Sequence, residues 1–491
     1  MRVTIAPAAF FLAASFAAAP ASAQVTDAGE ANGCAAELEW AAGFAARNYA
    51  GFETKTAGDA GVEYDRLLAE LRPAAAAAST ELECNAILGR WVAFFGDGHL
   101  SYRRAGRQET ASAAPATDDE VRARFADWPV RPMTESQARE ILDGLASGRS
   151  PIEGIWQIGD GSYRAAVLRD DDDPARFTMS ILRADSVWWL PGQVKARFIP
   201  TADETYAVQF FMRDHSEQNW AGRVMRNVLH LDGGSPWFRD WPVEPGDVSP
   251  EDYQASRNSR FGVRQLDPNT LLVQLPTFGD AAGVDALFAS EGDRIRGTER
   301  LVLDLRGNGG GSDYNFRALI PLIYSGPIRM VSNAALATDD NIRANELLAA
   351  DTTLPAGIRV QLAGSVARMR TALGGWYEFD DRVIDDLEPM PLPRTVAVVV
   401  DRGCASSCEQ FLLAARQSSK VTIYGTRTAG ILDFGNVRTG RMPGGTLVLN
   451  YPTTRSKRLP DAPVDGTGIL PDVEIPDGEQ DAPAWVLRHL P

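Results

Sequence analysis

Lysine and histidine are scarce in this chain. The basic residues are nearly all arginine, and the only lysines are Lys55, Lys195, Lys420 and Lys457. The only histidines are His99, His215, His230 and His489. A reaction that needs a lysine amine or an imidazole as its base therefore has few candidate residues.

The chain also lacks the positive charge that a polyanion binder needs. Its formal net charge is −16 at pH 7. Such an acidic protein is repelled by phosphate backbones and by anionic lipid headgroups. We therefore expect neither a nucleic acid nor an anionic membrane surface as its partner.

Long hydrophobic runs are absent after the first residues. Residues 1–23 have Arg2 at the start, an apolar stretch through Phe16 and the small-residue run Ala21-Ser22-Ala23. This pattern is typical of a secretory signal that is cleaved near Ala23. No later segment approaches the roughly 18 apolar residues of a spanning helix. We expect an exported protein, periplasmic or secreted, with no membrane span.

Cysteine is rare too, and the expected export decides how the four residues are read. Cys34, Cys84, Cys404 and Cys408 can form two disulfides in an oxidising compartment, with three pairings open. Cys34–Cys84 would clip an N-terminal helical pair, and Cys404–Cys408 would close a local loop. A zinc site is disfavoured because no histidine lies near these cysteines in the sequence.

The hydrophobic periodicity changes along the chain and predicts an α/β protein of several domains. Helical spacing predicts an N-terminal helical region, alternation predicts a middle antiparallel β domain, and buried apolar runs such as "RLVLDLR" and "TVAVVVD" predict a largely parallel α/β core. The expected parts are a signal at 1–23, a helical region at 24–105 that carries His99, a linker with a short helix at 106–151, the β domain at 152–250 and the α/β domain at 251–491.

Three stretches could carry chemistry. The segment "VVVDRGCASSCEQF" (398–411) predicts a strand, a sharp turn and a helix, with Ser406 and Ser407 at the helix start. This geometry suits a serine nucleophile, although either serine could simply cap the helix. "RLVLDLRGNGGG" (300–311) ends a strand in glycines whose N–H groups can approach a ligand, but the lysine of a phosphate loop is missing. "FFGDGHLSY" (94–102) holds His99 in a glycine-containing turn.

Together these stretches resemble the tail-specific, or C-terminal processing, serine peptidase family. "IYGTRTAG" (423–430) and "DGTGILPDVEIP" (465–476) are similar to its later motifs and stand in the family's order. The resemblance implies a ClpP/crotonase-like peptidase domain with Ser406 as the nucleophile. It also implies an oxyanion hole made by the N–H groups of Ser407 and of the glycine loop, with Gly310 and Gly311 as the preferred donors.

The chain departs from the Ser–Lys members of that family, because Ile431 stands where they carry lysine. The branch similar to the core of tricorn protease uses histidine instead, and "GDGHL" matches its turn. This resemblance implies His99 as the general base and Asp465 as a possible orienter of the imidazole. A Cys404–Cys408 disulfide would then span the nucleophile turn and fix its geometry.

The expected function is that of an exported serine peptidase that cleaves polypeptides through an acyl-enzyme, with no metal and no organic cofactor. The alternative is a non-catalytic binding protein or pseudopeptidase of the same fold. No glycine-rich carboxylate loop of a PDZ domain precedes the α/β domain, so a preference for C-terminal tails is not implied. An α/β-hydrolase is disfavoured because the chain lacks the Gly-x-Ser-x-Gly turn.

Overall fold

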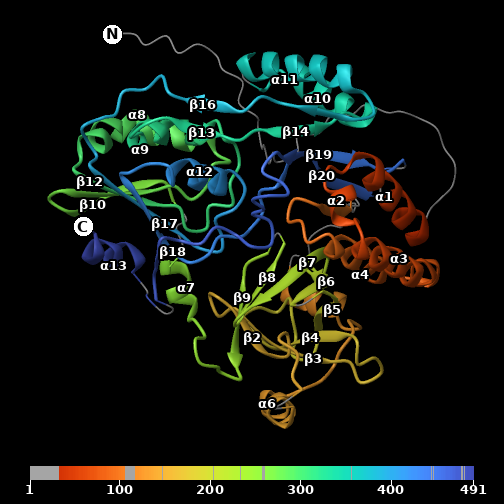
Figure 1. Cartoon of the computed structure of the whole chain (residues 1–491). Helices are drawn as coiled ribbons and strands as arrows, with labels where there is room; N and C mark the ends of the chain where they lie inside the picture. Colours follow the sequence, from red (N-terminus) through yellow and green to blue (C-terminus); the bar gives the residue numbers. More distant parts are fainter. Residues whose placement is uncertain are drawn as a thin grey trace.

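A computed structural model describes residues 33–104, 117–145, 148–202, 204–232, 234–256, 260–354, 356–443, 445, 447–476, 479 and 481–490. The expected signal and its cleavage point near Ala23 lie outside the described residues. In the described part, a helical region, a β-barrel and an α/β region with several sheets lie side by side (Figure 1). The α/β fold class expected from the sequence is confirmed.

The N-terminal region is an assembly of four helices. They are α1 (Cys34–Asn48), α2 (Phe52–Lys55), α3 (Asp59–Ala77) and α4 (Glu81–Phe94). Helix α4 begins at a capping box in which Thr80 and Glu83 satisfy each other's backbone N–H groups. The Cys34–Cys84 disulfide joins the starts of α1 and α4, as the sequence predicted.

The middle of the chain is a closed antiparallel barrel, with two short helices, α5 (Asp118–Arg124) and α6 (Glu135–Gly144), before it. Its strands are β2 (Gly154–Ile158), β3 (Tyr163–Arg169), β4 (Phe177–Ala184), β5 (Val194–Ala202), β6 (Thr205–Phe211), β7 (Glu217–Met225), β8 (Val228–Leu231) and β9 (Trp237–Trp241). The pairing of β2 with β9 closes the ring. Trp156, Trp189 and Trp237 are fully buried and fill the barrel interior.

The central sheet of the α/β region has the order β10-β11-β12-β17-β18-β21. These strands are β10 (Gly262–Asp267), β11 (Thr270–Gln274), β12 (Arg300–Asp304), β17 (Thr395–Val400), β18 (Val421–Gly425) and β21 (Val473–Glu474). All neighbours are parallel except β10 and β11. Leu301, Leu303, Val396 and Val398 face one core and Val302 and Ala397 face another, as expected for strands covered on both faces.

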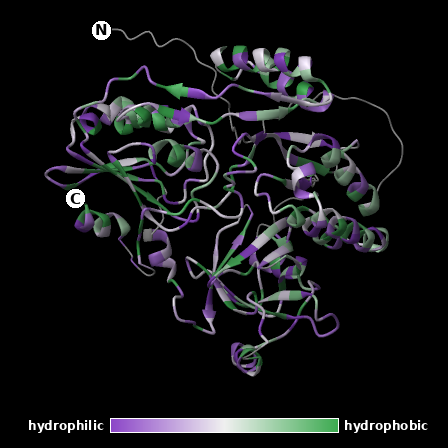
Figure 2. Ribbon diagram, in the orientation of Figure 1, coloured by the Kyte–Doolittle hydropathy of each residue, from purple (hydrophilic) through white to green (hydrophobic). Residues whose placement is uncertain are grey.

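Helices cover this sheet. They are α8 (Ala281–Gly297), η1 (Asn315–Leu319), α9 (Ile320–Ile323), α12 (Ser407–Ala415) and α13 (Ala482–His489). Helix α7 (Pro250–Ser256) instead contacts the barrel, where Tyr253 packs on Phe238. Figure 2 shows that hydrophobic residues gather along the strands of the sheet and on the helices packed against it. In the part of the chain that the structure describes, no helix is both long and apolar enough to cross a membrane.

A second sheet joins the N-terminal region to the C-terminal part of the chain. It contains β1 (Ser101–Arg104), β14 (Asn333–Leu336), β15 (Trp376–Glu378), β19 (Phe434–Arg441) and β20 (Leu447–Ser456). Helices α10 (Asp339–Ala350) and α11 (Ala356–Met369), with η2 (Arg370–Ala372), pack beside it, and β13 (Ile328–Met330) pairs with β16 (Arg382–Ile384). Because β1 pairs with β20, the histidine turn just before β1 is held against the C-terminal part of the chain.

Candidate active site

The turn between β17 and α12 holds Ser406 in an uncommon backbone conformation. Ser406 has φ 55° and ψ −119° and is 6% exposed. A residue other than glycine rarely adopts a positive φ, and such strain persists only where the surroundings enforce it. Among the described residues, four others that are not glycine share this feature: Glu204, His215, Arg226 and Asn436.

Hydrogen bonds to the Ser406 N–H enforce this conformation. The N–H donates to the Ile431 carbonyl at 2.9 Å and to the Glu409 carboxylate at 3.2 Å. The Cys404–Cys408 disulfide brackets the same turn, and both cysteines are fully buried. Of the three pairings that the sequence left open, the structure has Cys34–Cys84 with Cys404–Cys408.

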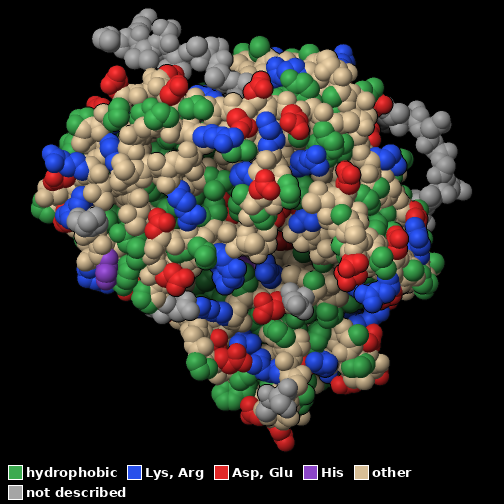
Figure 3. All heavy atoms as spheres, viewed as in Figure 1, with side chains coloured by type: hydrophobic (Ala, Val, Ile, Leu, Met, Phe, Trp, Pro, Cys, Tyr) green, Lys and Arg blue, Asp and Glu red, His purple; other side chains and the backbone are tan. Residues whose placement is uncertain are grey.

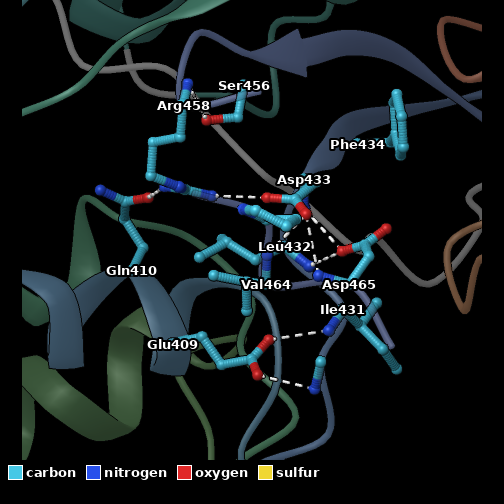
Figure 4. A network of polar contacts seen from close by, with 12 residues as sticks. Glu409, Gln410, Ile431, Leu432, Asp433, Phe434, Ser456, Arg458, Val464 and Asp465 are labelled. Carbon is cyan, nitrogen blue, oxygen red and sulfur yellow. Dashed lines mark hydrogen bonds and ion pairs between the residues drawn. The ribbon is translucent and has the colours of Figure 1, made fainter. Parts of the chain in front are cut away.

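Glu409 is the polar centre of this region, a role that its position near a helix start did not reveal. Its carboxylate is fully buried and accepts the Thr428 hydroxyl at 2.5 Å, the Gly430 N–H at 2.7 Å and the Ile431 N–H at 2.9 Å. Figure 4 shows the bond to the N–H of Ile431, which precedes β19 in the chain. One side chain thus ties the serine turn to the segment 428–431.

Glu409→Gln should therefore destabilise the protein. An amide NH₂ would replace one accepting oxygen and leave at least one buried N–H without an acceptor, which costs about 1–3 kcal/mol. We expect the free energy of unfolding in urea to fall by about 2 kcal/mol. Glu388→Gln, at an exposed position, is the matched control and should change it by less than about 0.5 kcal/mol. Equal unfolding midpoints for the two variants would refute the role given to Glu409.

The glycine loop after β12 lies against the serine turn. Asn308 is fully buried; its carbonyl accepts the Ala405 N–H at 3.1 Å and its side-chain oxygen accepts the Gly310 N–H at 3.0 Å. A Cβ atom at Gly310, where φ is +88°, would stand 2.8 Å from Ser406 Cβ and 2.8 Å from the Ser407 nitrogen. Only glycine fits at this contact.

The backbone donors differ in what they already bind. The Gly310 N–H is taken by Asn308, whereas the N–H groups of Ser407 and Gly311 make no hydrogen bond within the described residues. The first N–H groups of a helix are unpaired within it, and Ser407 begins α12. Within the described residues, the N–H groups of Ser407, Gly309 and Gly311 can thus donate to a developing negative charge without breaking a bond.

His99 is held by one backbone carbonyl and one side-chain carboxylate. Its Nδ1 lies 2.6 Å from the Phe434 carbonyl oxygen, and its N–H donates to Asp97 at 2.9 Å. A carbonyl can only accept, so Nδ1 carries a proton, and in the neutral imidazole Nε2 is the nitrogen with the lone pair. The buried Asp97 is fixed in turn by the Tyr49 hydroxyl at 2.6 Å.

The histidine turn and the serine turn meet at Ile431. A Cβ atom at Gly98 would lie 2.5 Å from Ile431 Cδ1, so the Ile431 side chain packs directly against the backbone of the histidine turn. The carbonyl of the same Ile431 accepts the Ser406 N–H. His99 and Ser406, far apart in the sequence, are therefore anchored to one short segment, residues 431–434.

Asp465 organises this segment and makes no hydrogen bond to His99 in the described residues. One of its oxygens accepts the N–H groups of Leu432 and Asp433, both at 2.7 Å. Asp433 returns the contact by accepting the N–H groups of Val464 and Asp465 at 2.7 and 2.8 Å. Figure 4 shows these bonds and the ion pair of Asp433 with Arg458.

Burial raises the pKa of Asp465 to about 6, and the negative charges of Asp97 and Asp433 act in the same direction. The hydrogen bonds from residues 432 and 433 oppose this shift. The cation that pairs with Asp465 in the described residues is Lys55, whose Nζ lies 4.0 Å from the Asp465 carboxylate and 5.4 Å from the Phe434 ring centre. This N-terminal lysine could not be placed near the site from the sequence.

Two lysines that follow Ser406 are engaged elsewhere. Lys420 donates to the Met390 carbonyl at 2.6 Å and Lys457 to the Phe379 carbonyl at 2.9 Å.

The described residues contain no group of three or more His, Cys, Asp or Glu side chains arranged to hold a metal ion. Figure 3 shows acidic and basic side chains interspersed on the visible face.

Comparison with known proteins gives one family. Residues 269–475 match the model of peptidase family S41. No curated protein matches the chain.

Solved structures with some likeness include a putative peptidase from Parabacteroides merdae (14% identity, 90% of each chain covered, TM-score 0.40). Mature CPAF has 11% identity, with 90% of this chain and 92% of that chain covered and a TM-score of 0.46. Tricorn protease has 12% identity, with 90% of this chain and 34% of that chain covered and a TM-score of 0.36.

Proposed function

We propose that this chain, whose residues 269–475 match the model of peptidase family S41, is a serine peptidase that cleaves polypeptides through an acyl-enzyme on Ser406. The observation that carries the proposal is the shared anchor at residues 431–434. Its Ile431 carbonyl holds the Ser406 N–H, and its Phe434 carbonyl holds His99 Nδ1.

In the proposed reaction, His99 Nε2 takes the proton of the Ser406 hydroxyl as Oγ attacks the carbonyl carbon of the scissile peptide bond. The imidazolium then gives this proton to the leaving amine nitrogen, and the C–N bond breaks. A water molecule repeats the sequence on the ester, which releases the acid and restores Ser406. The Phe434 carbonyl keeps the imidazole in the tautomer that this step requires.

The developing oxyanion needs donors that are ready before the reaction begins. The N–H groups of Ser407 and Gly311 meet this requirement because neither makes a hydrogen bond in the described residues. The Gly310 N–H, which the sequence also favoured, would have to leave Asn308 first. We therefore assign the oxyanion hole to Ser407 and Gly311, with Gly310 providing the space between them and Ser406.

Export remains part of the proposal. Two disulfides suit an oxidising compartment such as the periplasm or the exterior.

The experiment that tests the function is incubation of the oxidised, mature protein with a denatured polypeptide, followed by mass spectrometry of the products. Internal cleavage that persists in EDTA supports a metal-free serine peptidase. Intact substrate from folded protein would contradict the proposal.

The proposed role of Asp465 is to shape the 432–433 turn, and Asp465→Asn tests it. Asparagine keeps an oxygen for the N–H groups of Leu432 and Asp433, so we expect kcat to fall less than about 10-fold. In a serine–histidine–aspartate triad, loss of the aspartate charge costs about 10⁴ in kcat. A loss of that size would show that Asp465 orients His99.

The same variant has a predicted pH signature. The pKa of Asp465 is raised in the folded protein to about 6, so its protonated form stabilises the fold below about pH 4, and this stabilisation is lost as the pH rises through about 6. The asparagine side chain of the variant does not titrate. The melting temperature of Asp465→Asn relative to the wild type should therefore increase between pH 4 and pH 7. A constant difference would refute this.

A further inference from the structure

A small cavity lies between the helices α10 and α11 and the sheet formed by β14, β19 and β20. Its volume is about 30 Å³, and its polar lining includes Asn345, Gln361, Ser365, Asn436, Arg438 and Thr454. Figure 1 draws α10 and α11 at the top of the molecule, beside β14 and β19. The cavity is separate from the serine turn and from the barrel.

The unusual member of this lining is Arg438. Its residue is 7% exposed, and its guanidinium donates to the Val437 carbonyl at 2.9 Å and to the Asn345 side-chain oxygen at 2.7 Å. Both acceptors are neutral. The Nε–H group has no partner in the described residues, and no carboxylate there forms an ion pair with this side chain.

A buried guanidinium without an anion is costly, because buried charges in proteins are paired as a rule. Burial lowers the pKa of Arg438 to about 10, so the group still carries its charge at neutral pH. The other polar groups of the cavity are amides and hydroxyls, which can donate to an anion but cannot neutralise the cation. The site thus supplies positive charge and donors and lacks one negative group.

We propose that this cavity binds a small planar oxyanion on the guanidinium of Arg438. The planar fork of arginine matches the two oxygens of a carboxylate. A volume of about 30 Å³ is small, which favours a compact oxyanion such as formate, acetate or bicarbonate. The bound anion would bridge β19 to α10 and α11.

This bridge reaches toward the active site along β19. Asn436 lines the cavity with a φ of 52°, and it lies two residues after Phe434, whose carbonyl holds His99. Binding of the anion would therefore stabilise the strand that positions the imidazole. The proposal concerns a second site and does not depend on peptidase activity.

The test is the melting temperature of the purified mature protein while sodium chloride is replaced by sodium formate at constant ionic strength, with bicarbonate as a second arm. A ligand that binds only the folded state stabilises it by mass action. We expect a saturable rise of about 2–4 °C for the wild type at roughly 100 times the dissociation constant. No rise in melting temperature with either oxyanion would overturn the assignment. An equally large, saturable rise when sodium chloride alone is titrated would also overturn it.

Two variants locate the response. Arg438→Gln removes the charge, and Arg441→Gln, at an exposed position of the same strand, is the matched control that should keep the full response. Asn345→Asp places a carboxylate where an amide oxygen already contacts the guanidinium. It should abolish the response even if Arg438→Gln does not fold. A wild-type response in Asn345→Asp would contradict the site.

Discussion

Ser406→Ala is expected to lower kcat for peptide hydrolysis by about 10⁶-fold, the largest loss from any single substitution in this chain. Removing the nucleophile of a serine protease leaves only the oxyanion hole and substrate binding, and such losses reach about 2 × 10⁶. The hydroxyl is the group removed, and the bonds from the Ser406 N–H to Ile431 and Glu409 stay. The measurement is kcat on a quenched fluorescent polypeptide.

Ser407→Ala is the matched control for this result. Ser407 contributes its backbone N–H in the proposed mechanism, and alanine keeps that group. We expect kcat to change less than about 10-fold. If Ser407→Ala were the inactive variant and Ser406→Ala the active one, the nucleophile would be assigned to the wrong serine of the pair.

His99→Ala is the second large effect, and we expect kcat to fall by about 10⁴–10⁶-fold. Without the Nε2 atom of the His99 imidazole, no other group in the proposed mechanism can take the proton of the Ser406 hydroxyl. The fold should change little, since His99 is half-buried and the Asp97–Tyr49 bond remains. His489→Ala, at the C-terminal helix α13, is the control and should keep full activity. A His99→Ala enzyme within about 10-fold of the wild type would exclude this base.

Much of this arrangement could be predicted from residue types in their order along the chain. Two serines between a buried strand and a helix, a glycine run after another strand and a histidine in a tight turn are each visible in the sequence. Buried parallel strands also have a clear signal, because "TVAVVVD" has no polar face. These features depend on local backbone geometry, which sequence patterns report well.

The features of the site that the sequence did not predict depend on contacts between distant segments. Every residue has a backbone carbonyl, so the residue type at position 434 could not identify the Phe434 carbonyl as the partner of His99. Glu409 looks like an ordinary helix-start carboxylate that accepts the Ser406 N–H, and its three other hydrogen bonds exist only once residues 428–431 pack beside it. Likewise, the sequence could not place Lys55 beside Asp465.

The barrel illustrates the same limit. Alternating residues predict antiparallel strands, but a sheet and a barrel share this pattern. The difference is the pairing of β2 with β9, in which Ile158 faces Trp237 and Gln157 faces Phe238. Closure depends on strand tilt and register around the whole ring, and periodicity within a single strand carries no such information.

The most direct test of the account is the rate at which a fluorophosphonate probe labels the mature, oxidised protein. The wild type should be labelled at a single site, Ser406, and Ser406→Ala should not be labelled. His99→Ala should lose labelling, whereas Lys55→Ala should keep it. Undiminished labelling of His99→Ala, or its loss in Lys55→Ala, would contradict the claim that a histidine held by the Phe434 carbonyl activates Ser406.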